Sequence, residues 1–94
     1  MSLEQDVERG RQAQEVLGNA VYAESYTLIE QEIYKAWQNS REQADREQLH
    51  QLLRMLEKAK LVLESTMRSG KIAADQLLQK RNLAERTLAR LRPS

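Results

Sequence analysis

The chain has 94 residues, 31% of them charged, and it contains three glycines, one proline, no phenylalanine and no cysteine. Leucine, alanine, glutamate, glutamine, arginine and lysine dominate, and these residues lose little side-chain freedom in a helix. The lack of cysteine excludes a disulfide framework and a thiolate zinc site. We therefore predict an all-α protein. A single chain this short buries only a modest core, which makes self-association or partners relevant.

The net charge of +1 conceals a gradient along the chain. Residues 1–37 carry a net charge of −4, residues 38–67 are neutral overall, and residues 68–94 carry +5. Such polarity can pair neighbouring molecules head to tail or present a basic end to an acidic partner. It is equally typical of solvated helix faces that merely differ in sign, so the gradient alone does not choose between these interpretations.

The first predicted helix covers residues 3–17. Ser2 and Gln5 have the spacing of a capping box, and a thin apolar stripe of Leu3, Val7 and Leu17 follows. Gly10 lies inside this helix and costs about 1 kcal/mol relative to alanine. We therefore expect residues 1–18 to form a weakly ordered helical segment that precedes the main domain at residues 19–94.

The amino terminus has neither a cationic start nor an apolar run, so we expect no secretory signal. No stretch approaches the roughly 20 apolar residues that span a bilayer, and the basic segment lacks the aromatic anchors of a membrane-surface helix. We therefore expect a cytoplasmic protein with no membrane partner.

A second helix is predicted at about residues 20–38. It follows Gly18, which is typical of a helix C-terminus, and Asn19, which suits a helix N-cap. One face of this helix is apolar, with residues at spacings of four, three, four and four: Tyr22, Tyr26, Ile29, Ile33 and Trp37. Because tyrosine and tryptophan have polar tips, this face suits the margin of a small core.

Residues 39–43 form the predicted turn, and Ser40 with Gln43 repeats the capping-box spacing, which predicts that the third helix starts at Ser40. Such a short connection brings consecutive helices back antiparallel. The fold that follows is an antiparallel helical hairpin with a long C-terminal helix.

Every seventh residue of that last helix belongs to one row, in which five of seven positions are leucine: Leu49, Leu56, Leu63, Gly70, Leu77, Ala84 and Leu91. The predicted companion row is Leu52, Ala59, Thr66 and Ala73, widened by Leu53 and Met67. A single helix over residues 40–92 would be about 80 Å long and would need a long partner, and a strict seven-residue row favours a supercoil. Two arrangements remain open: a continuous helix, with or without a bend at Gly70, or two helices separated there. Either way, we expect a bundle or coiled coil formed by self-association.

The hairpin partner, at about 19 residues, can cover only the first part of the long helix. We therefore predict two sets of contacts. The packing set within the hairpin is Tyr22, Tyr26, Ile29, Ile33, Leu49, Leu52, Leu56 and Leu63. The set that contacts another molecule is Leu77, Ala84, Leu88 and Leu91.

Residues for catalysis are scarce. Glu47 and His50 have the Glu-x-x-His spacing of di-iron helix bundles, but there is one copy, and helical projection places it on the polar face, away from the leucine row. His50 is the only histidine, and no nucleophile elbow or glycine-rich phosphate cradle is present. We predict no catalytic residues, no cofactor, no metal site and no small-molecule substrate.

The basic end offers a rival interpretation, in which arginine and lysine side chains contact the phosphates of a nucleic acid. These bases do not concentrate on one helical face, and no aromatic residue or helix-turn-helix spacing accompanies them. The candidate contact residues are Lys80, Arg81, Arg86, Arg90 and Arg92.

Residues 20–78 resemble a family of small helical proteins encoded among the head and packaging genes of tailed bacteriophages and prophages. The pattern that carries the resemblance is Ala23-Glu24-x-Tyr26, Ile29-Glu30-x-Glu32-Ile33, Ala36-Trp37, Arg46-Glu47, the leucine row from Leu49 to Leu63, and Gly70-Lys71-Ile72-Ala73-x-x-x-Leu77. The resemblance implies a non-enzymatic role in virion assembly or as a virion component, in the cytoplasm of a bacterial host or associated with the virion. The expected partner is then a second copy or another phage assembly protein. The alternative is a DNA-packaging accessory protein that uses the basic end.

Overall fold

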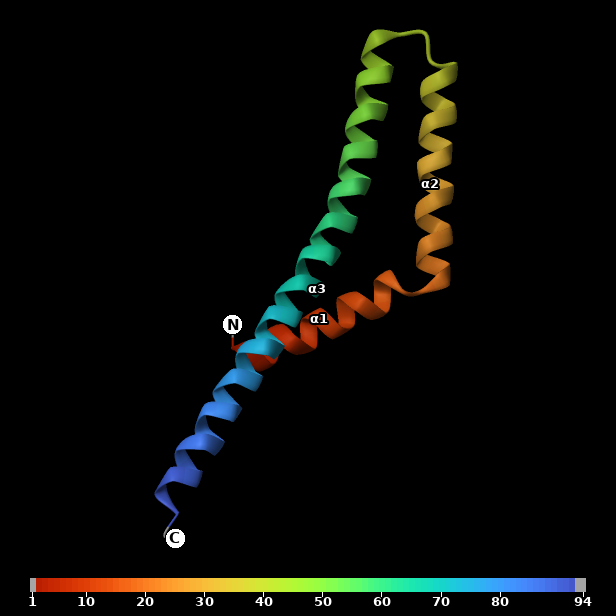
Figure 1. The fold of residues 1–94 in the computed structure, drawn as a ribbon. Helices are drawn as coiled ribbons and strands as arrows, with labels where there is room; N and C mark the ends of the chain where they lie inside the picture. Colours follow the sequence, from red (N-terminus) through yellow and green to blue (C-terminus); the bar gives the residue numbers. More distant parts are fainter. Residues whose placement is uncertain (1, 93–94) are drawn as a thin grey trace.

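The structure is a computed structural model that describes residues 2–92. It consists of three helices, α1 (Leu3–Leu17), α2 (Ala20–Asn39) and α3 (Gln43–Leu91), and residues 2–92 contain no strand. The molecule measures 81 × 25 × 16 Å, with α3 along its whole length (Figure 1). The prediction of an all-α fold with an antiparallel hairpin and a long C-terminal helix is confirmed. The outer bounds of the predicted segments, residues 1 and 94, lie outside the described residues, and the division at residue 18 stays a prediction.

Local hydrogen bonds set the ends of the first two helices where the sequence places them. The Ser2 Oγ accepts from the Gln5 N–H at 3.2 Å, and the Gln5 Oε1 accepts from the Ser2 N–H at 3.1 Å. The Gly18 N–H donates to the Gln14 carbonyl at 2.9 Å, and the Asn19 Oδ1 accepts from the Tyr22 N–H at 3.0 Å. The predicted capping box and the helix break at residues 18 and 19 are therefore confirmed.

The predicted capping box at Ser40 is wrong. The third helix begins at Gln43, and Glu42 is at its N-cap without a capping hydrogen bond from its side chain. Ser40 instead ends α2, because its N–H donates to the Trp37 carbonyl at 3.3 Å. The backbone is extended at both Ser40 and Glu42, since the chain must cross from the end of one helix to the start of the next.

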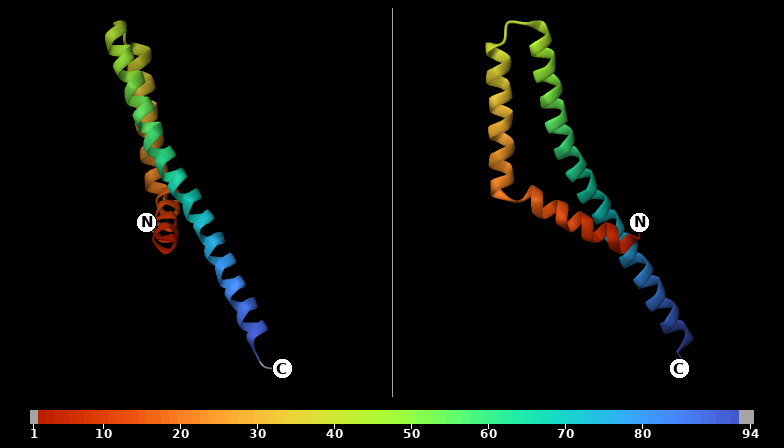
Figure 2. Two further views of the ribbon diagram at one scale, coloured as in Figure 1. Left: turned by 90° about the vertical axis from the view of Figure 1, so that its left-hand side faces the viewer. Right: turned by 180° about the vertical axis from the view of Figure 1, so that it is seen from behind.

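The long helix is continuous through Gly70. Its 49 residues extend for about 74 Å at 1.5 Å per residue. Figure 2 shows it running as one rod from the turn to the C-terminus in both views. Of the two arrangements that the sequence left open, the single helix is therefore the one observed.

Gly70 is the place where α1 crosses α3. A Cβ atom built on Gly10 would lie 2.6 Å from the Gly70 Cα, and one built on Gly70 would lie 2.7 Å from the Gly10 Cα. Three residues after each glycine is a buried alanine, Ala13 at 4% exposure and Ala73 at 3%. Four small residues thus let the two backbones touch, and this contact offsets the helical cost of Gly10.

The α2–α3 hairpin is much less closely packed than this crossing. The two helices lie near each other at the turn and separate towards the start of α2, where α1 joins it (Figure 1). None of the residues Ala20–Asn39, all of which the structure describes, is buried. Cations bridge the two helices: the Arg46 Cζ lies 3.8 Å from the Trp37 ring centre, and the Lys60 Nζ lies 4.9 Å from that of Tyr26.

Burial along α3 confirms most of the predicted packing set and corrects the rest. Tyr22, Tyr26 and Ile33 are half-buried, as are the row residues Leu49, Leu56 and Leu63. Two members were predicted wrongly, because Ile29 is 45% exposed and Leu52 is 56% exposed.

The companion row in the hairpin lies one position further along the helix than predicted. Leu53, at 9% exposure, is the buried leucine of the hairpin, and Lys60 and Met67 continue its row in half-buried positions. The Tyr26 ring faces Lys60, so α2 approaches α3 from the side that carries this row. Ala59 of the predicted row is therefore exposed, whereas Ala73 is buried because α1 covers a different side of α3.

Candidate interaction surfaces

The end of α3 projects beyond the other two helices. We call residues 78–92 the C-terminal arm, and every one of them is exposed. Leu88 is 62% exposed and Leu91 74%. Neither α1 nor α2 lies alongside the arm (Figures 1 and 2). The arm is thus a stretch of regular helix whose leucines have no cover within residues 2–92.

The predicted intermolecular set divides at the base of the arm. Leu77 is half-buried next to the α1 crossing, one heptad after Gly70, and so contributes to packing within the chain. Ala84, Leu88 and Leu91 are exposed and continue the same helical face outwards. The structure therefore leaves three of the four side chains accessible. That they contact another molecule stays a prediction.

The predicted nucleic-acid contacts are also exposed, but they point in several directions. Lys80, Arg81, Arg86, Arg90 and Arg92 give the arm a net charge of +4 after Glu85 is subtracted. The Arg81 Nε donates to the Glu85 Oε1 at 3.1 Å, which neutralises the one base located within the leucine face. Arg86 and Arg90, four residues apart, share another face. The arm is a basic rod and not a one-sided basic patch.

The hairpin has an apolar side that sequence reasoning missed. Ala36 and Leu52 line one shallow depression close to the turn, which places them on the same side of the hairpin. Exposed apolar residues extend this side at helical spacing along both helices. We call the open hairpin side the set Ile29, Ala36, Leu52, Met55, Ala59 and Val62. The signal was present as the spacing three, four, three from Leu52 to Val62, but the sequence alone could not separate it from the buried row beside it.

The opposite side of the hairpin is polar. A shallow depression there is lined by Trp37, Arg41, Gln43, Arg46, Glu47, His50, Gln51 and Arg54. Three arginines in this depression repel a metal cation from Glu47 and His50. Within residues 2–92, no group of three or more histidine, cysteine, aspartate or glutamate side chains could hold a metal ion. Glu47 and His50 therefore share their depression with three arginines.

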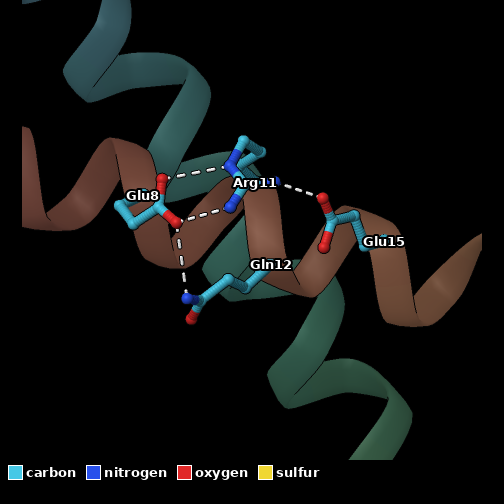
Figure 3. A network of polar contacts seen from close by, with 4 residues as sticks. All are labelled: Glu8, Arg11, Gln12 and Glu15. Atoms are coloured by element: carbon cyan, nitrogen blue, oxygen red, sulfur yellow. Dashed lines mark hydrogen bonds and ion pairs between the residues drawn. The ribbon is translucent and has the colours of Figure 1, made fainter.

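The clearest polar network lies on the surface of α1 (Figure 3). Arg11 bonds to Glu8 at 2.6 and 3.0 Å and also to Glu15, while Gln12 donates to Glu8 at 3.4 Å. The hydrogen bond from Arg11 lowers the pKa of Glu8, and the same bond, together with Glu15, raises the pKa of Arg11. All these side chains belong to one helix and lie at spacings of three and four, so the network supports α1 locally.

The pKa of Tyr26 is also shifted from its ordinary value. Burial between the two helices of the hairpin raises the pKa of its phenol, and the nearby carboxylates of Glu30 and Glu57 raise it further. The phenol therefore stays neutral at physiological pH, and its ring packs against the side chain of Lys60 across the hairpin.

Among the described residues, no helix is long and apolar enough to cross a membrane. Comparisons with models of known protein families, with curated proteins and with solved structures found no match. The resemblance to phage proteins therefore stays a prediction from the sequence, and the surfaces described above carry the functional argument.

Proposed function

We propose that this protein is a non-enzymatic helical interaction protein of a tailed phage or prophage, which acts in virion assembly within the bacterial host or on the virion. It associates through the C-terminal arm with copies of itself or with another assembly protein. The observation that supports this is the exposed face of Ala84, Leu88 and Leu91, which continues the packing row of α3 beyond its last partner within the chain. The phage origin rests on the resemblance of residues 20–78.

The leucines of the arm make association favourable. Fully burying a leucine side chain is worth about 1.5–3 kcal/mol, and Leu88 and Leu91 retain most of their surface in the single chain. A regular helix also presents these side chains without a further cost for ordering the backbone, since α3 is already formed. A helical partner that covers the face therefore gains affinity from each leucine.

Sedimentation velocity at high micromolar concentration tests the proposal. Leu88→Asp should weaken self-association by roughly 30-fold or more, because about 2 kcal/mol of apolar burial is replaced by the cost of covering a charge. Leu83→Asp is the matched control, since Leu83 is 58% exposed on another face of the same arm. Circular dichroism checks that both variants keep their helices.

A monomeric wild-type protein at these concentrations would show that the arm does not bind a second copy. Equal losses in both variants would show that any added negative charge, and not the leucine face, disrupts association. The identity of neighbouring genes tests the phage origin separately: a portal or terminase gene supports it, and a metabolic operon contradicts it.

A second candidate is a DNA-packaging accessory protein, favoured by the five exposed bases of the arm. Binding to duplex DNA should weaken as salt rises, with a slope of about −0.9 per phosphate contact in log K against log salt. Arg86→Gln with Arg90→Gln should reduce that slope, whereas Arg41→Gln, at the hairpin turn, should leave it unchanged. Failure to bind DNA in low salt would remove this candidate.

A further inference from the structure

The chain exposes far more surface than a compact protein of its mass. Its accessible surface is 7889 Å², while a monomer of 10.9 kDa is expected to expose about 5,600 Å². The difference of about 2,300 Å² exceeds the roughly 800 Å² that each partner buries in one standard interface. It leaves room for more than two such interfaces on every chain.

Two separate apolar surfaces contribute to this excess. One is the leucine face of the C-terminal arm, and the other is the open hairpin side, where Leu52 and Val62 are each 56% exposed and Met55 is 65% exposed. The arm helix from residue 78 to residue 91 is about 21 Å long, and the stretch from Leu52 to Val62 is about 15 Å long. The arm is therefore long enough to cover the open hairpin side.

The charges of the two surfaces are complementary. Glu32 lies between Ile29 and Ala36 at helical spacing, and Asp45 lines the same depression as Leu52. At the outer margin of this side, the depression that holds Met55 is lined by two bases, Arg54 and Lys58, and by the acid Glu57. The helix α2 as a whole has a net charge of −2. The arm brings Lys80 and Arg92 beside its leucine face, with a net charge of +4. Pairing one arm with another arm would instead oppose two charges of +4.

We infer that the occupant of the open hairpin side is the C-terminal arm of a second copy of this chain. The arm lies along α2 and α3 as a third helix, with its leucine face against the row from Leu52 to Val62 and with its bases near Glu32 and Asp45. This inference rests on the proposed function of the arm and names the surface that receives it. Because the arm and the hairpin side are different surfaces of one chain, the contact is heterologous, and repetition builds a ring or a filament.

Mixing two defective variants tests this arrangement. Leu88→Asp damages the arm and leaves the hairpin side intact, whereas Leu52→Asp does the reverse. Each variant alone should be monomeric at a concentration where the wild type associates. An equimolar mixture should form a 1:1 dimer, because one undamaged arm still meets one undamaged hairpin side.

Matched controls separate this effect from misfolding. Leu61→Asp changes a leucine of the same exposure, 57% against 56% for Leu52, nine residues along α3 and so on its opposite face. This variant should associate as the wild type does. Ile29→Asp provides a second lesion of the hairpin side from α2, and it should behave as Leu52→Asp does. Circular dichroism and urea unfolding establish that each variant is folded.

The outcomes distinguish the inference from the proposed function. If Leu88→Asp is monomeric but Leu52→Asp and Ile29→Asp associate normally, arms bind elsewhere: the inference is overturned and the role of the arm stands. A mixture that stays monomeric overturns the inference in the same way. If Leu88→Asp associates as strongly as the wild type, the arm has no role and both fail.

Discussion

The two larger helix contacts of this molecule, both made with α3, are built from residues of opposite size. At the α1–α3 crossing, glycine and alanine bring two backbones together, and Gly10, Ala13, Gly70 and Ala73 are all buried. In the α2–α3 hairpin, aromatic and aliphatic side chains face α3, yet none of the residues Ala20–Asn39 is buried. Large side chains keep α2 and α3 apart, and the sides of these helices stay in contact with water. The hairpin contact is therefore less closely packed than the α1–α3 crossing, although its side chains are larger and more apolar.

Gly70→Ala should have the largest effect on the crossing. It should lower the free energy of unfolding, whereas the same substitution in an exposed helix usually raises it. In an exposed helix, alanine in place of glycine stabilises by about 1 kcal/mol. Here the new Cβ would lie 2.7 Å from the Gly10 Cα and 3.0 Å from the Asp6 carbonyl oxygen, both backbone atoms. We expect the free energy of unfolding to fall by about 3 kcal/mol in urea titration, with faster amide exchange in α1.

Ala74→Val is the control for the crossing, because Ala74 is exposed on α3 four residues away and tolerates added volume. Its free energy of unfolding should stay within about 1 kcal/mol of the wild type, most of it the lower helix propensity of valine. If Gly70→Ala proved as stable as the wild type, with α1 equally protected from exchange, the close approach of the two glycines would be wrong.

Two adjacent leucines test which side of α3 the hairpin covers. Leu53→Ala removes a side chain that is 9% exposed and should lower the free energy of unfolding by about 2 kcal/mol, the low end for a buried leucine because the hairpin packs loosely. Leu52→Ala removes one that is 56% exposed and should cost less than about 1 kcal/mol in dilute, monomeric protein. Reversed values in urea titration would restore the companion row that the sequence predicted.

These contacts also mark the limit of what the sequence could predict. Caps at Ser2 and Asn19 follow from side chains within three residues, so the helix bounds were accessible to local reasoning. The Ser40 cap failed because the path between two packed helices, a tertiary property, decides the backbone there. Gly10 and Gly70 are in contact although they lie far apart in the chain. The residues next to either glycine give no indication of which residue it contacts.

The candidate surfaces divide in the same way. The leucine face of the arm was predicted from its seven-residue period, which depends on the helix alone. The open hairpin side was missed because apolar residues at helical spacing occur both in the row from Leu52 and, at Leu53 and Met67, in the row beside it. Only the approach of α2, with the Tyr26 ring beside Lys60, determines which of the two rows is covered.

The smallest expected effect concerns how far the hairpin excludes water from the Tyr26 phenol. Burial, with help from Glu30 and Glu57, raises the pKa of this phenol in the folded state above its ordinary value of about 10. A raised folded-state pKa means that the folded chain holds the proton more tightly than the unfolded chain. The corresponding stability is fully present below the unfolded-state pKa and is lost as pH rises through the folded-state pKa.

Urea midpoints should therefore fall above about pH 10 in the wild type, and Tyr26→Phe should remove part of that fall. Tyr34→Phe, a change at an exposed tyrosine of the same helix, is the matched control. An unchanged pH slope in Tyr26→Phe would mean that water reaches the phenol freely, and that the hairpin is more open than its half-buried tyrosine implies.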